Sequence, residues 1–286
     1  MSETALRLTG KTRVLAVFGC PVEHSLSPAM HNAAIRALGL DLVYVPFRVE
    51  PARLRDAVAG VRAMGFLGVN LTIPLKEQAV SLVDGLSPGA ARVGSVNTLW
   101  WKDGCLMGES TDGPGFISSL EEAGGLPDTA LVLGAGGSGR AVCFALAERG
   151  VRIILANRTP ERARRLAEEL GDANVRVIPM DVEALREACR EADLVVNCTS
   201  VGMSPNIGVS PLPPDALRAG QTVYDLVYNP PETRLLADAR AAGARPINGV
   251  RMLVHQGAYS FRLWTGVDPP LNVMEAAVME GLKQEA

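Results

Sequence analysis

The sequence predicts an α/β protein with two domains, each built on a mostly parallel sheet. Strand-like and helix-like segments alternate along nearly all of its 286 residues, a pattern typical of helices layered on parallel sheets. This length suits two domains of about 150 residues each. In addition, a glycine-rich segment at residues 134–139 separates an apolar strand-like run from a helix-like run, as in a βαβ unit.

The elements of the first half follow from apolar periodicity and from residues that start or end helices. Ser27 is expected to cap the first helix and Pro28 to be its first residue, whereas Gly65 ends the second helix. The dipeptide Asp103-Gly104 predicts the turn of an antiparallel hairpin. In chain order we expect a strand at 13–19, a helix at 27–40, a strand at 41–49, a helix at 51–65, a strand at 69–76 and a hairpin at 95–109.

The second half repeats the strand–helix alternation. It begins with the strand, glycine-rich turn and helix around residues 134–139, and it ends with a helix at 232–242 and two final helices. We therefore expect one domain at 113–248. Residues 1–112, completed by the final helices at 249–286, are expected to form the other domain.

The segment GAGGSG matches the dinucleotide-binding pattern G-x-G-x-x-G in the right context. Gly134 permits a tight turn, Gly136 lets the backbone approach a pyrophosphate, and Gly139 lets the helix pack closely on the strand. Free N–H groups at the start of the helix favour phosphate binding. The sequence thus predicts a Rossmann-like, doubly wound domain that binds a dinucleotide, beside an N-terminal α/β substrate domain.

The end of the next strand indicates which dinucleotide binds. A site for NAD usually carries an acidic residue there, which bonds the adenosine ribose. Here Asn157, Arg158 and Thr159 occupy the position, with Arg162 and Arg165 one and two turns later. A guanidinium suits the 2′-phosphate that an acid would repel, so Arg158 favours NADP. For Arg165 we prefer the alternative that it only decorates a solvated helix.

Composition argues against several other functions. The net charge of −3 and the aromatic content of 5% do not support nucleic-acid binding. The five cysteines form no CxxC pair and no metal-like spacing, as expected for reduced thiols in a cytosolic protein. Neither a signal segment nor a membrane span is recognisable. We expect a cytoplasmic protein without a metal, and a homodimer is compatible with the sequence.

Residues 69–76, VNLTIPLK, place a polar row, Asn70, Thr72 and Lys76, beside an apolar row. In an extended strand the three polar side chains would point to one face. A solvated outer face is one interpretation of the polar row, and a shelf for a substrate is the other. Hydride transfer from an alcohol also requires a group that takes the hydroxyl proton, and Lys76 is the candidate. Asp112, in a predicted tight turn, is its candidate partner.

Several segments, spread over nearly the whole chain, resemble those of the shikimate dehydrogenase family. They are GCPVEHSLSPAMHN, GVNLTIPLK, GSVNTL, STDG, GAGGSGRA, NRT, VNCTSVGM, DLVYNP and GVRMLVHQGAYSF. Two positions depart from the family pattern. Ser110 stands where the family usually has Asn, and Val250-Arg251 stands where a smaller or apolar pair is common, near the expected cofactor cleft.

The resemblance implies an enzyme that reversibly reduces 3-dehydroshikimate to shikimate with NADPH, on the way to chorismate and the aromatic amino acids. It implies that Lys76 and Asp112 are the catalytic pair. For the substrate it implies Ser25 and Ser27 at the carboxylate, and Asn70, Thr72, Asn97, Gln256 and Tyr228 at the rest of the molecule. For the cofactor it implies Gly134, Ala135, Gly136, Gly137 and Ser138 at the pyrophosphate, Asn157, Arg158, Thr159 and Arg162 at the adenosine end, and Leu226 and Gly249 near the nicotinamide.

Several alternatives stay open at this point. From the residues alone, Asn97 fits a hairpin cap and Gln256 fits an exposed helix position as well as they fit a site. A quinate/shikimate dehydrogenase that uses NAD or NADP is a rival function, against which Arg158 argues. A regulator that senses NADPH without chemistry is another, but it would have no reason to keep Lys76 and Asp112.

Overall fold

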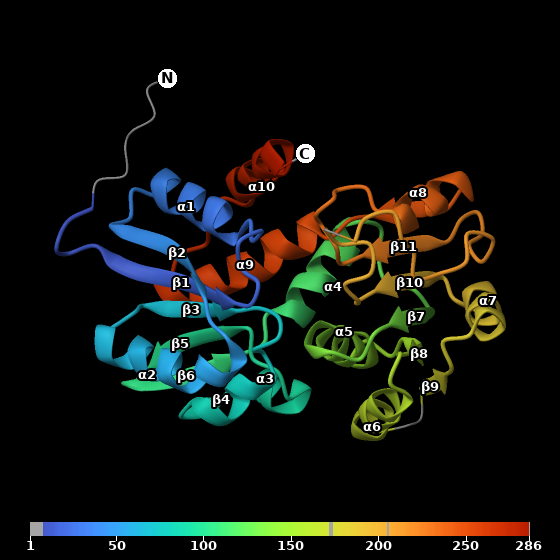
Figure 1. The fold of residues 1–286 in the computed structure, drawn as a ribbon, viewed down its shortest axis with the longest axis horizontal. Coiled ribbons are helices and arrows are strands. Elements are labelled where there is room, and N and C mark those ends of the chain that lie inside the picture. Colours follow the sequence, from blue (N-terminus) through green and yellow to red (C-terminus); the bar gives the residue numbers. More distant parts are fainter. Residues whose placement is uncertain (1–7, 172–173, 205, 286) are drawn as a thin grey trace.

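In the computed structural model, which describes residues 8–171, 174–204 and 206–285, the chain forms two α/β halves that stand side by side (Figure 1). Strands in this described part of the chain build two six-stranded sheets, one from each half. The predicted α/β fold class is confirmed. None of the helices among the described residues is long and apolar enough to cross a membrane.

The first sheet is mixed rather than purely parallel. Its strand order is β2-β1-β3-β5-β6-β4, in which β2, β1 and β3 are parallel and β5 is antiparallel to both of its neighbours. Strands β1, β3 and β6 therefore end at the same edge, and the loops after them meet there. The elements are β1 (Arg13–Gly19), α1 (Ser27–Ala37), β2 (Leu42–Arg48), η1 (Pro51–Arg53), α2 (Leu54–Met64), β3 (Gly68–Leu71), η2 (Gln78–Leu82), β4 (Gly85–Leu86), α3 (Pro88–Val93), β5 (Thr98–Lys102) and β6 (Cys105–Glu109).

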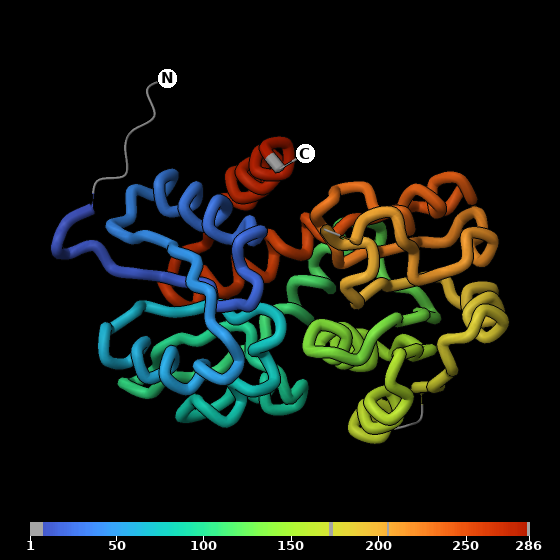
Figure 2. The backbone as a smooth tube through the Cα atoms, viewed as in Figure 1, coloured from blue at the N-terminus to red at the C-terminus, as the bar shows by residue number. Residues whose placement is uncertain are grey.

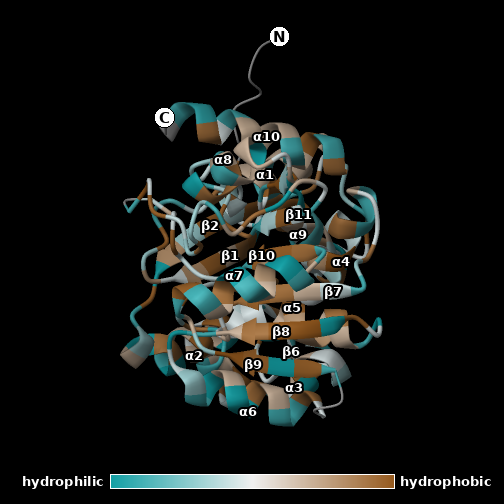
Figure 3. Ribbon diagram, turned by 90° about the vertical axis from the view of Figure 1, so that its right-hand side faces the viewer, coloured by the Kyte–Doolittle hydropathy of each residue, from teal (hydrophilic) through white to brown (hydrophobic). Residues whose placement is uncertain are grey.

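The second sheet is parallel throughout. Its order is β12-β11-β10-β7-β8-β9, which in its own chain order is the 3-2-1-4-5-6 arrangement of doubly wound dinucleotide-binding domains. In Figure 3 the outer faces of α6 and α7 are hydrophilic, whereas β8 is hydrophobic. The elements are β7 (Thr129–Leu133), α5 (Gly137–Ala147), β8 (Arg152–Ala156), α6 (Pro160–Leu170), β9 (Val175–Ile178), α7 (Val182–Glu191), β10 (Leu194–Asn197), β11 (Thr222–Asp225), α8 (Arg234–Ala241) and β12 (Arg245–Ile247).

Two helices carry the chain between the halves. Helix α4 (Asp112–Glu122) leads out of the first half, and α9 (Val250–Thr265) leads back to it and packs against α4. A methyl group on Gly115 of α4 would lie 2.7 Å from the backbone nitrogen of Gln256, so glycine is needed for this close packing. The site described below lies next to this pair of helices.

The last helices cover the first sheet. Figure 2 shows the red C-terminal part of the chain lying against the blue N-terminal segments. Phe261 and Trp264 of α9 and Met274 of α10 (Leu271–Glu285) belong to the same buried cluster as Leu15 and Val17 of β1. The core of the first half is therefore built from both ends of the chain.

The predicted hairpin is confirmed, as β5 and β6 pair in antiparallel fashion around Asp103 and Gly104. Both residues have positive φ, 50° and 80°. Positive φ at both central positions is the requirement of the tight turn whose twist matches paired strands.

Two local expectations in the first half are wrong. The strand predicted at 69–76 ends at Leu71, and the chain turns so that the Leu75 N–H donates to the Thr72 carbonyl. Pro74 has no N–H with which to continue a sheet ladder. Ser27 is the first residue of α1 rather than its cap, which is Leu26.

Candidate active site

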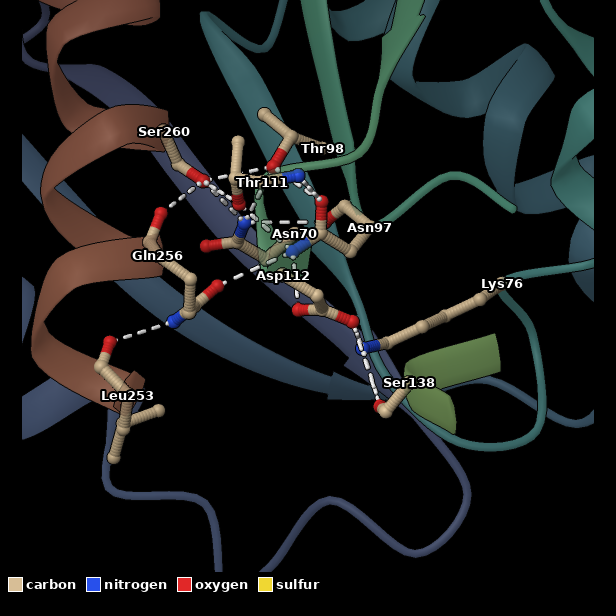
Figure 4. A network of polar contacts seen from close by, with 10 residues as sticks. All are labelled: Asn70, Lys76, Asn97, Thr98, Thr111, Asp112, Ser138, Leu253, Gln256 and Ser260. Carbon is tan, nitrogen blue, oxygen red and sulfur yellow. Dashed lines mark hydrogen bonds and ion pairs between the residues drawn. The ribbon is translucent and has the colours of Figure 1, made fainter. Parts of the chain in front are cut away.

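The side chains of Lys76 and Asp112 form an ion pair where β3 and β6 end (Figure 4). Lys76 Nζ lies 2.5 Å from Asp112 Oδ2, and the two side chains are 13% and 6% exposed. Burial removes much of the water that would screen the two charges, so their attraction is stronger than at a surface. The structure thus brings the predicted acid/base candidate and its predicted partner together.

Asp112 opens helix α4, so the expectation that it lies in an isolated tight turn is wrong. Gly113, Pro114 and Gly115 suggest a turn by composition, but proline is tolerated in the first turn of a helix because the N–H it lacks would have no partner there. A methyl group on Gly113 would lie 3.0 Å from the Ala141 carbonyl oxygen of α5. The glycine therefore serves helix packing, and the helix dipole favours the Asp112 carboxylate.

Asn97 holds the second oxygen of the Asp112 carboxylate. Asn97 Nδ2 donates to Asp112 Oδ1, and Asn97 Oδ1 accepts the backbone N–H of Thr111, both at 2.8 Å. Because a backbone N–H can only donate, the second bond fixes which end of the amide faces Asp112. Asn97 is 2% exposed and bonds to Asp112, so its side chain does more than cap the hairpin.

Asn70 lies in the same buried polar network. Its Oδ1 accepts the Tyr44 hydroxyl at 2.7 Å, and its Nδ2 lies 3.1 Å from both Thr98 Oγ1 and Ser260 Oγ. The polar row expected for a long strand is therefore not formed, because its other two members follow the end of β3. Asn70 does not belong to a solvated face.

Gln256 of α9 joins this network from the far end of the sequence. Its Oε1 accepts from Asn97 Nδ2 at 3.2 Å, and its Nε2 donates to the Leu253 carbonyl at 2.8 Å. One turn later, the Ser260 hydroxyl donates to the Gln256 carbonyl at 3.0 Å. Gln256 is buried, which rules out the exposed helix position that the sequence left open.

The Tyr44 hydroxyl lies near two further residues predicted to bind the substrate, Ser27 and Tyr228. Burial raises the pKa of its hydroxyl well above 10, a hydrogen bond with Ser27 opposes the rise, and the neighbouring Tyr228 adds to it. Ser25 precedes α1, and its hydroxyl accepts the Ser27 backbone N–H at 3.4 Å. The sequence did not point to Tyr44. The available signal was a tyrosine at an inward position of a predicted strand, where its hydroxyl requires a partner.

The glycine-rich turn has the geometry that its three glycines predict. Gly134 has a φ of +105°, and a methyl group on Gly139 would lie 2.1 Å from the Gly134 carbonyl oxygen. A methyl group on Gly136, in contrast, would meet no atom of the described residues within 4 Å. The turn is thus closed on the side of the sheet and open at Gly136.

The turn meets the ion pair directly. Ser138 Oγ lies 3.5 Å from Lys76 Nζ and 3.4 Å from Asp112 Oδ2. A methyl group on Gly137 would lie 3.5 Å from Lys76 Cβ. Side chains from both halves are therefore within hydrogen-bond reach of one another at this point.

Asn157 ties the glycine-rich turn to the end of β8. Its Oδ1 accepts the Ala135 backbone N–H at 3.0 Å, and its Nδ2 donates to the Thr159 carbonyl at 2.8 Å. Both the oxygen and the nitrogen of the Asn157 side-chain amide are therefore hydrogen-bonded to backbone groups. Asn157 shapes the turn as well as standing at the end of the strand.

Arg158 and Arg162 are exposed at the start of α6 and form no ion pair with any described residue. Arg164 and Arg165 of the same helix each pair with a glutamate on it. The interpretation of Arg165 as part of a solvated helix face agrees with its 81% exposed side chain. Arg158, which the sequence favours for a 2′-phosphate, and Arg162, expected at the adenosine end, therefore have no carboxylate partner among the described residues.

Leu226 and Gly249 lie against each other at the end of β11. A methyl group on Gly249 would lie 2.1 Å from the Leu226 carbonyl oxygen, and the Gly249 N–H donates to the Val227 carbonyl at 3.2 Å. Glycine is therefore required where α9 begins. The two residues predicted to lie near the nicotinamide, Leu226 and Gly249, are therefore in direct contact.

The two positions that depart from the family pattern have different surroundings. Ser110 is buried, and its backbone N–H donates to Glu109 Oε1 at 2.9 Å. Arg251 is held by ion pairs with Glu122 and with Glu275, the latter at 2.6 Å. Arg251 follows Gly249 by two residues, but its guanidinium is directed to α4 and α10.

Three family models match the chain in sequence. Residues 17–99 match the shikimate dehydrogenase substrate binding domain, residues 122–206 match shikimate / quinate 5-dehydrogenase, and residues 249–279 match the shikimate 5′-dehydrogenase C-terminal domain. Together the matched segments include β3, the glycine-rich turn and α9.

Among curated proteins, the chain is 50% identical to shikimate dehydrogenase (NADP⁺) of Moorella thermoacetica, over 97% of this chain and 96% of that one. It is 49% identical to the enzyme of the same name from Methanosarcina mazei, over 95% and 99%.

Among solved structures, a shikimate dehydrogenase in complex with NADP⁺ matches with a TM-score of 0.91 and 40% identity, covering 96% of this chain and 98% of that one. The Thermus thermophilus enzyme in complex with NADP(H) and shikimate matches with a TM-score of 0.86 and 46% identity, covering 94% and 100%. A quinate dehydrogenase from Corynebacterium glutamicum in complex with NAD matches at 0.85 and 32%, covering 94% and 99%.

Proposed function

The chain belongs to the shikimate dehydrogenase family, and from this premise we propose which of its residues carry the reaction. The protein is an NADP-dependent oxidoreductase that reversibly reduces 3-dehydroshikimate to shikimate. This step belongs to the shikimate pathway, which leads to chorismate and the aromatic amino acids. The residue roles below are our proposal.

Lys76 and Asp112 handle the proton of the reacting hydroxyl. In the reducing direction, the Lys76 ammonium donates a proton to the ketone oxygen as negative charge develops there, and in the oxidising direction the neutral amine accepts that proton. Asp112 orients the ammonium through Oδ2, and Asn97 holds Oδ1 in place. The buried 2.5 Å contact between Lys76 and Asp112 is the observation that carries this assignment.

The groups around the glycine-rich turn fit NADP. The backbone at Gly136 is open to a pyrophosphate, and Arg158 and Arg162 are free for the 2′-phosphate. Leu226 and Gly249 stand at the far end of the same sheet edge, where a nicotinamide would lie. The cofactor, when bound, supplies or accepts the hydride. This chain's residues orient it so that the two reacting carbons approach contact distance.

Neutral polar side chains recognise the substrate. Ser25 and Ser27 flank the start of α1, where a helix N-terminus favours the substrate carboxylate. The remaining residues assigned by family position contact the ring hydroxyls and the rest of the substrate. They are Asn70, Thr72, Asn97, Tyr228 and Gln256. Such groups exchange hydrogen bonds without adding a competing charge, and they reject analogues that lack a partner hydroxyl.

A cofactor-reduction assay tests this function. The purified protein is given shikimate or quinate, each with NADP or NAD, and reduced nicotinamide is followed by its absorbance. We expect turnover with shikimate and NADP to exceed the other three combinations. Faster turnover with quinate and NAD would instead support the quinate/shikimate alternative, and no turnover with any pair would support the NADPH-sensing regulator.

We propose the following organisation around this activity. Residues 1–112 and 249–286 form the substrate domain, and residues 113–248 form the NADP domain. The enzyme works in the cytoplasm on small molecules, without nucleic acid or membrane, and this organisation is compatible with a homodimer. The domain division is supported by the single core that both chain ends build in the first half, and the net charge of −3 argues against nucleic acid as a partner.

A further inference from the structure

Asp225 is a fully buried carboxylate at the end of β11, and the roles proposed above leave it unused. Its Oδ1 accepts from Asn197 Nδ2 at 2.9 Å and from the Val227 backbone N–H at 3.0 Å. Its Oδ2 accepts the Thr233 hydroxyl at 2.7 Å. These three neutral donors come from three different segments of the chain.

Each donor fixes a segment of its own. Asn197 ends β10, and its side chain binds the Val201 carbonyl and both the N–H and the hydroxyl of Thr199. Val227 belongs to the loop after β11. Thr233 caps α8, since its hydroxyl oxygen accepts the Leu236 N–H at 3.3 Å. Asp225 therefore joins the loop after β10, the loop after β11 and the start of α8.

The two loops reach both parts of the proposed cofactor site. A methyl group on Gly134 would lie 3.1 Å from Thr199 Cγ2, so the loop after β10 packs against the glycine-rich turn. The loop after β11 begins with Leu226, which contacts Gly249, and it also carries Tyr228. Asp225 thus lies between the residues assigned to the pyrophosphate and those assigned to the nicotinamide and the substrate.

We propose that Asp225 is a positioning residue, which holds the segment Leu226–Tyr228 at a fixed distance from the glycine-rich turn and so sets the approach of nicotinamide to substrate. This inference rests on the proposed function. Hydride transfer requires near contact of two carbons, and a displacement of about 1 Å costs about 100-fold in rate. Binding of the cofactor depends more on the phosphates and the adenosine end, which Asp225 does not touch.

The chemistry of the carboxylate supports a geometric role. Burial raises the pKa of Asp225 to about 6 even though three hydrogen bonds oppose the rise. Keeping this group ionised at neutral pH therefore costs stability, which is expected of a residue retained for its geometry. An asparagine at 225 would keep the arrangement, since its oxygen accepts from Asn197 and Val227 and its nitrogen donates to Thr233 Oγ1.

Three variants test the proposal, namely Asp225→Ala, Asp225→Asn and the matched control Gln221→Ala. Gln221 directly precedes the same strand at its opposite end, is also fully buried, and donates to the Cys189 and Ala192 carbonyls, both at 2.8 Å. For each protein we would measure kcat and KM with shikimate and NADP, the Kd of NADPH from its fluorescence, and the melting temperature.

We expect Asp225→Ala to lower kcat about tenfold or more while the Kd of NADPH stays within about threefold, and Asp225→Asn to keep kcat within about threefold. Gln221→Ala should melt earlier with its kcat unchanged. An Asp225→Ala variant with the kcat of the wild type overturns the inference, as does a Gln221→Ala variant that loses the same share of kcat.

Two further outcomes are decisive. If Asp225→Ala does not fold, Thr233→Val breaks one of the three bonds and should lower kcat about threefold, and an unchanged kcat would count against Asp225. If the wild type itself does not oxidise shikimate with NADP, the proposed function fails together with this inference. An active wild type with an unaffected Asp225→Ala variant refutes this inference alone.

Discussion

The two halves of the molecule build their shares of the site in different ways. In the first half, Asn70, Asn97 and Asp112 are buried and hydrogen-bonded to one another or to common neighbours. In the second half, the corresponding groups are the backbone of a glycine-rich turn and two exposed arginines. A single substitution at one of these three first-half residues leaves a buried partner unsatisfied, whereas one at Arg158 or Arg162 leaves no buried partner behind. Cofactor preference is therefore easier to change than substrate chemistry.

The largest effect is expected at the centre of the first half. Lys76→Ala removes the proton donor and leaves the Asp112 carboxylate buried without its cation, so kcat should fall about 1000-fold. Initial rates of NADP reduction with shikimate measure this. Lys102→Ala, at the exposed end of β5, is the control and should keep full activity. A Lys76→Ala variant within tenfold of the wild type would remove Lys76 from the mechanism.

Asn97→Ala tests whether the loss of one buried hydrogen-bonding side chain in the first half lowers both the stability and the activity of the protein. The substitution leaves Asp112 Oδ1 and the Thr111 N–H without their buried partner, so the free energy of unfolding should fall by about 2 to 3 kcal/mol, and kcat should fall with it. Urea titration and initial rates give the two quantities. Gln221→Ala should lose similar stability and keep kcat. Full activity in Asn97→Ala would show that Asp112 needs no second support.

Arg158→Ala tests the contrasting claim for the second half. Loss of a charge-assisted bond to the 2′-phosphate should raise the KM for NADP about tenfold and leave the KM for NAD and the melting temperature unchanged. Arg165→Ala removes an arginine that already pairs with Glu169, so it should change neither KM. Equal effects of Arg158→Ala on NADP and NAD would contradict a phosphate contact.

The smallest effect concerns Asp225 and depends on pH. Its pKa of about 6 in the folded protein exceeds the ordinary 3.8, so the folded state binds the proton more tightly. The resulting stabilisation is complete below pH 3.8 and is lost as the pH rises through 6. Between pH 5 and pH 7.5 the unfolding free energy of Asp225→Asn should therefore gain about 1 kcal/mol over the wild type.

Urea titrations at the two pH values measure this difference between Asp225→Asn and the wild type. The neighbouring Cys198 has its own pKa raised further by burial, so it stays neutral over this range and does not contribute. The same difference at both pH values would contradict an ionised Asp225 at neutral pH.

The sequence predicted best what local chemistry decides. The glycine-rich turn, the hairpin at Asp103-Gly104 and the helix end at Gly65 each depend on a few neighbouring residues, and all three occur as expected. The Lys76–Asp112 pair was also anticipated, although it joins residues 36 positions apart.

What the sequence did not reveal depends on contacts between distant segments. Gly113 and Gly115 look like turn residues, yet they serve the packing of α4 against α5 and α9. The bonds of Asn70 to Tyr44 and to Ser260 require that β2 and α9 lie beside β3, and Ser260 is 190 positions away. No local sequence pattern encodes such neighbours. The structure therefore has a buried polar network around Asn70 where the sequence predicted a polar row along one strand.

The return of α9 and α10 to the first sheet has a consequence for synthesis of the protein. On the ribosome, β1 and α1 emerge long before the helices that cover them, so their apolar surface stays uncovered until the last part of the chain is made. Uncovered apolar surface in nascent chains invites aggregation and chaperone binding. A chain that lacks the final two helices would therefore leave one face of the first sheet uncovered.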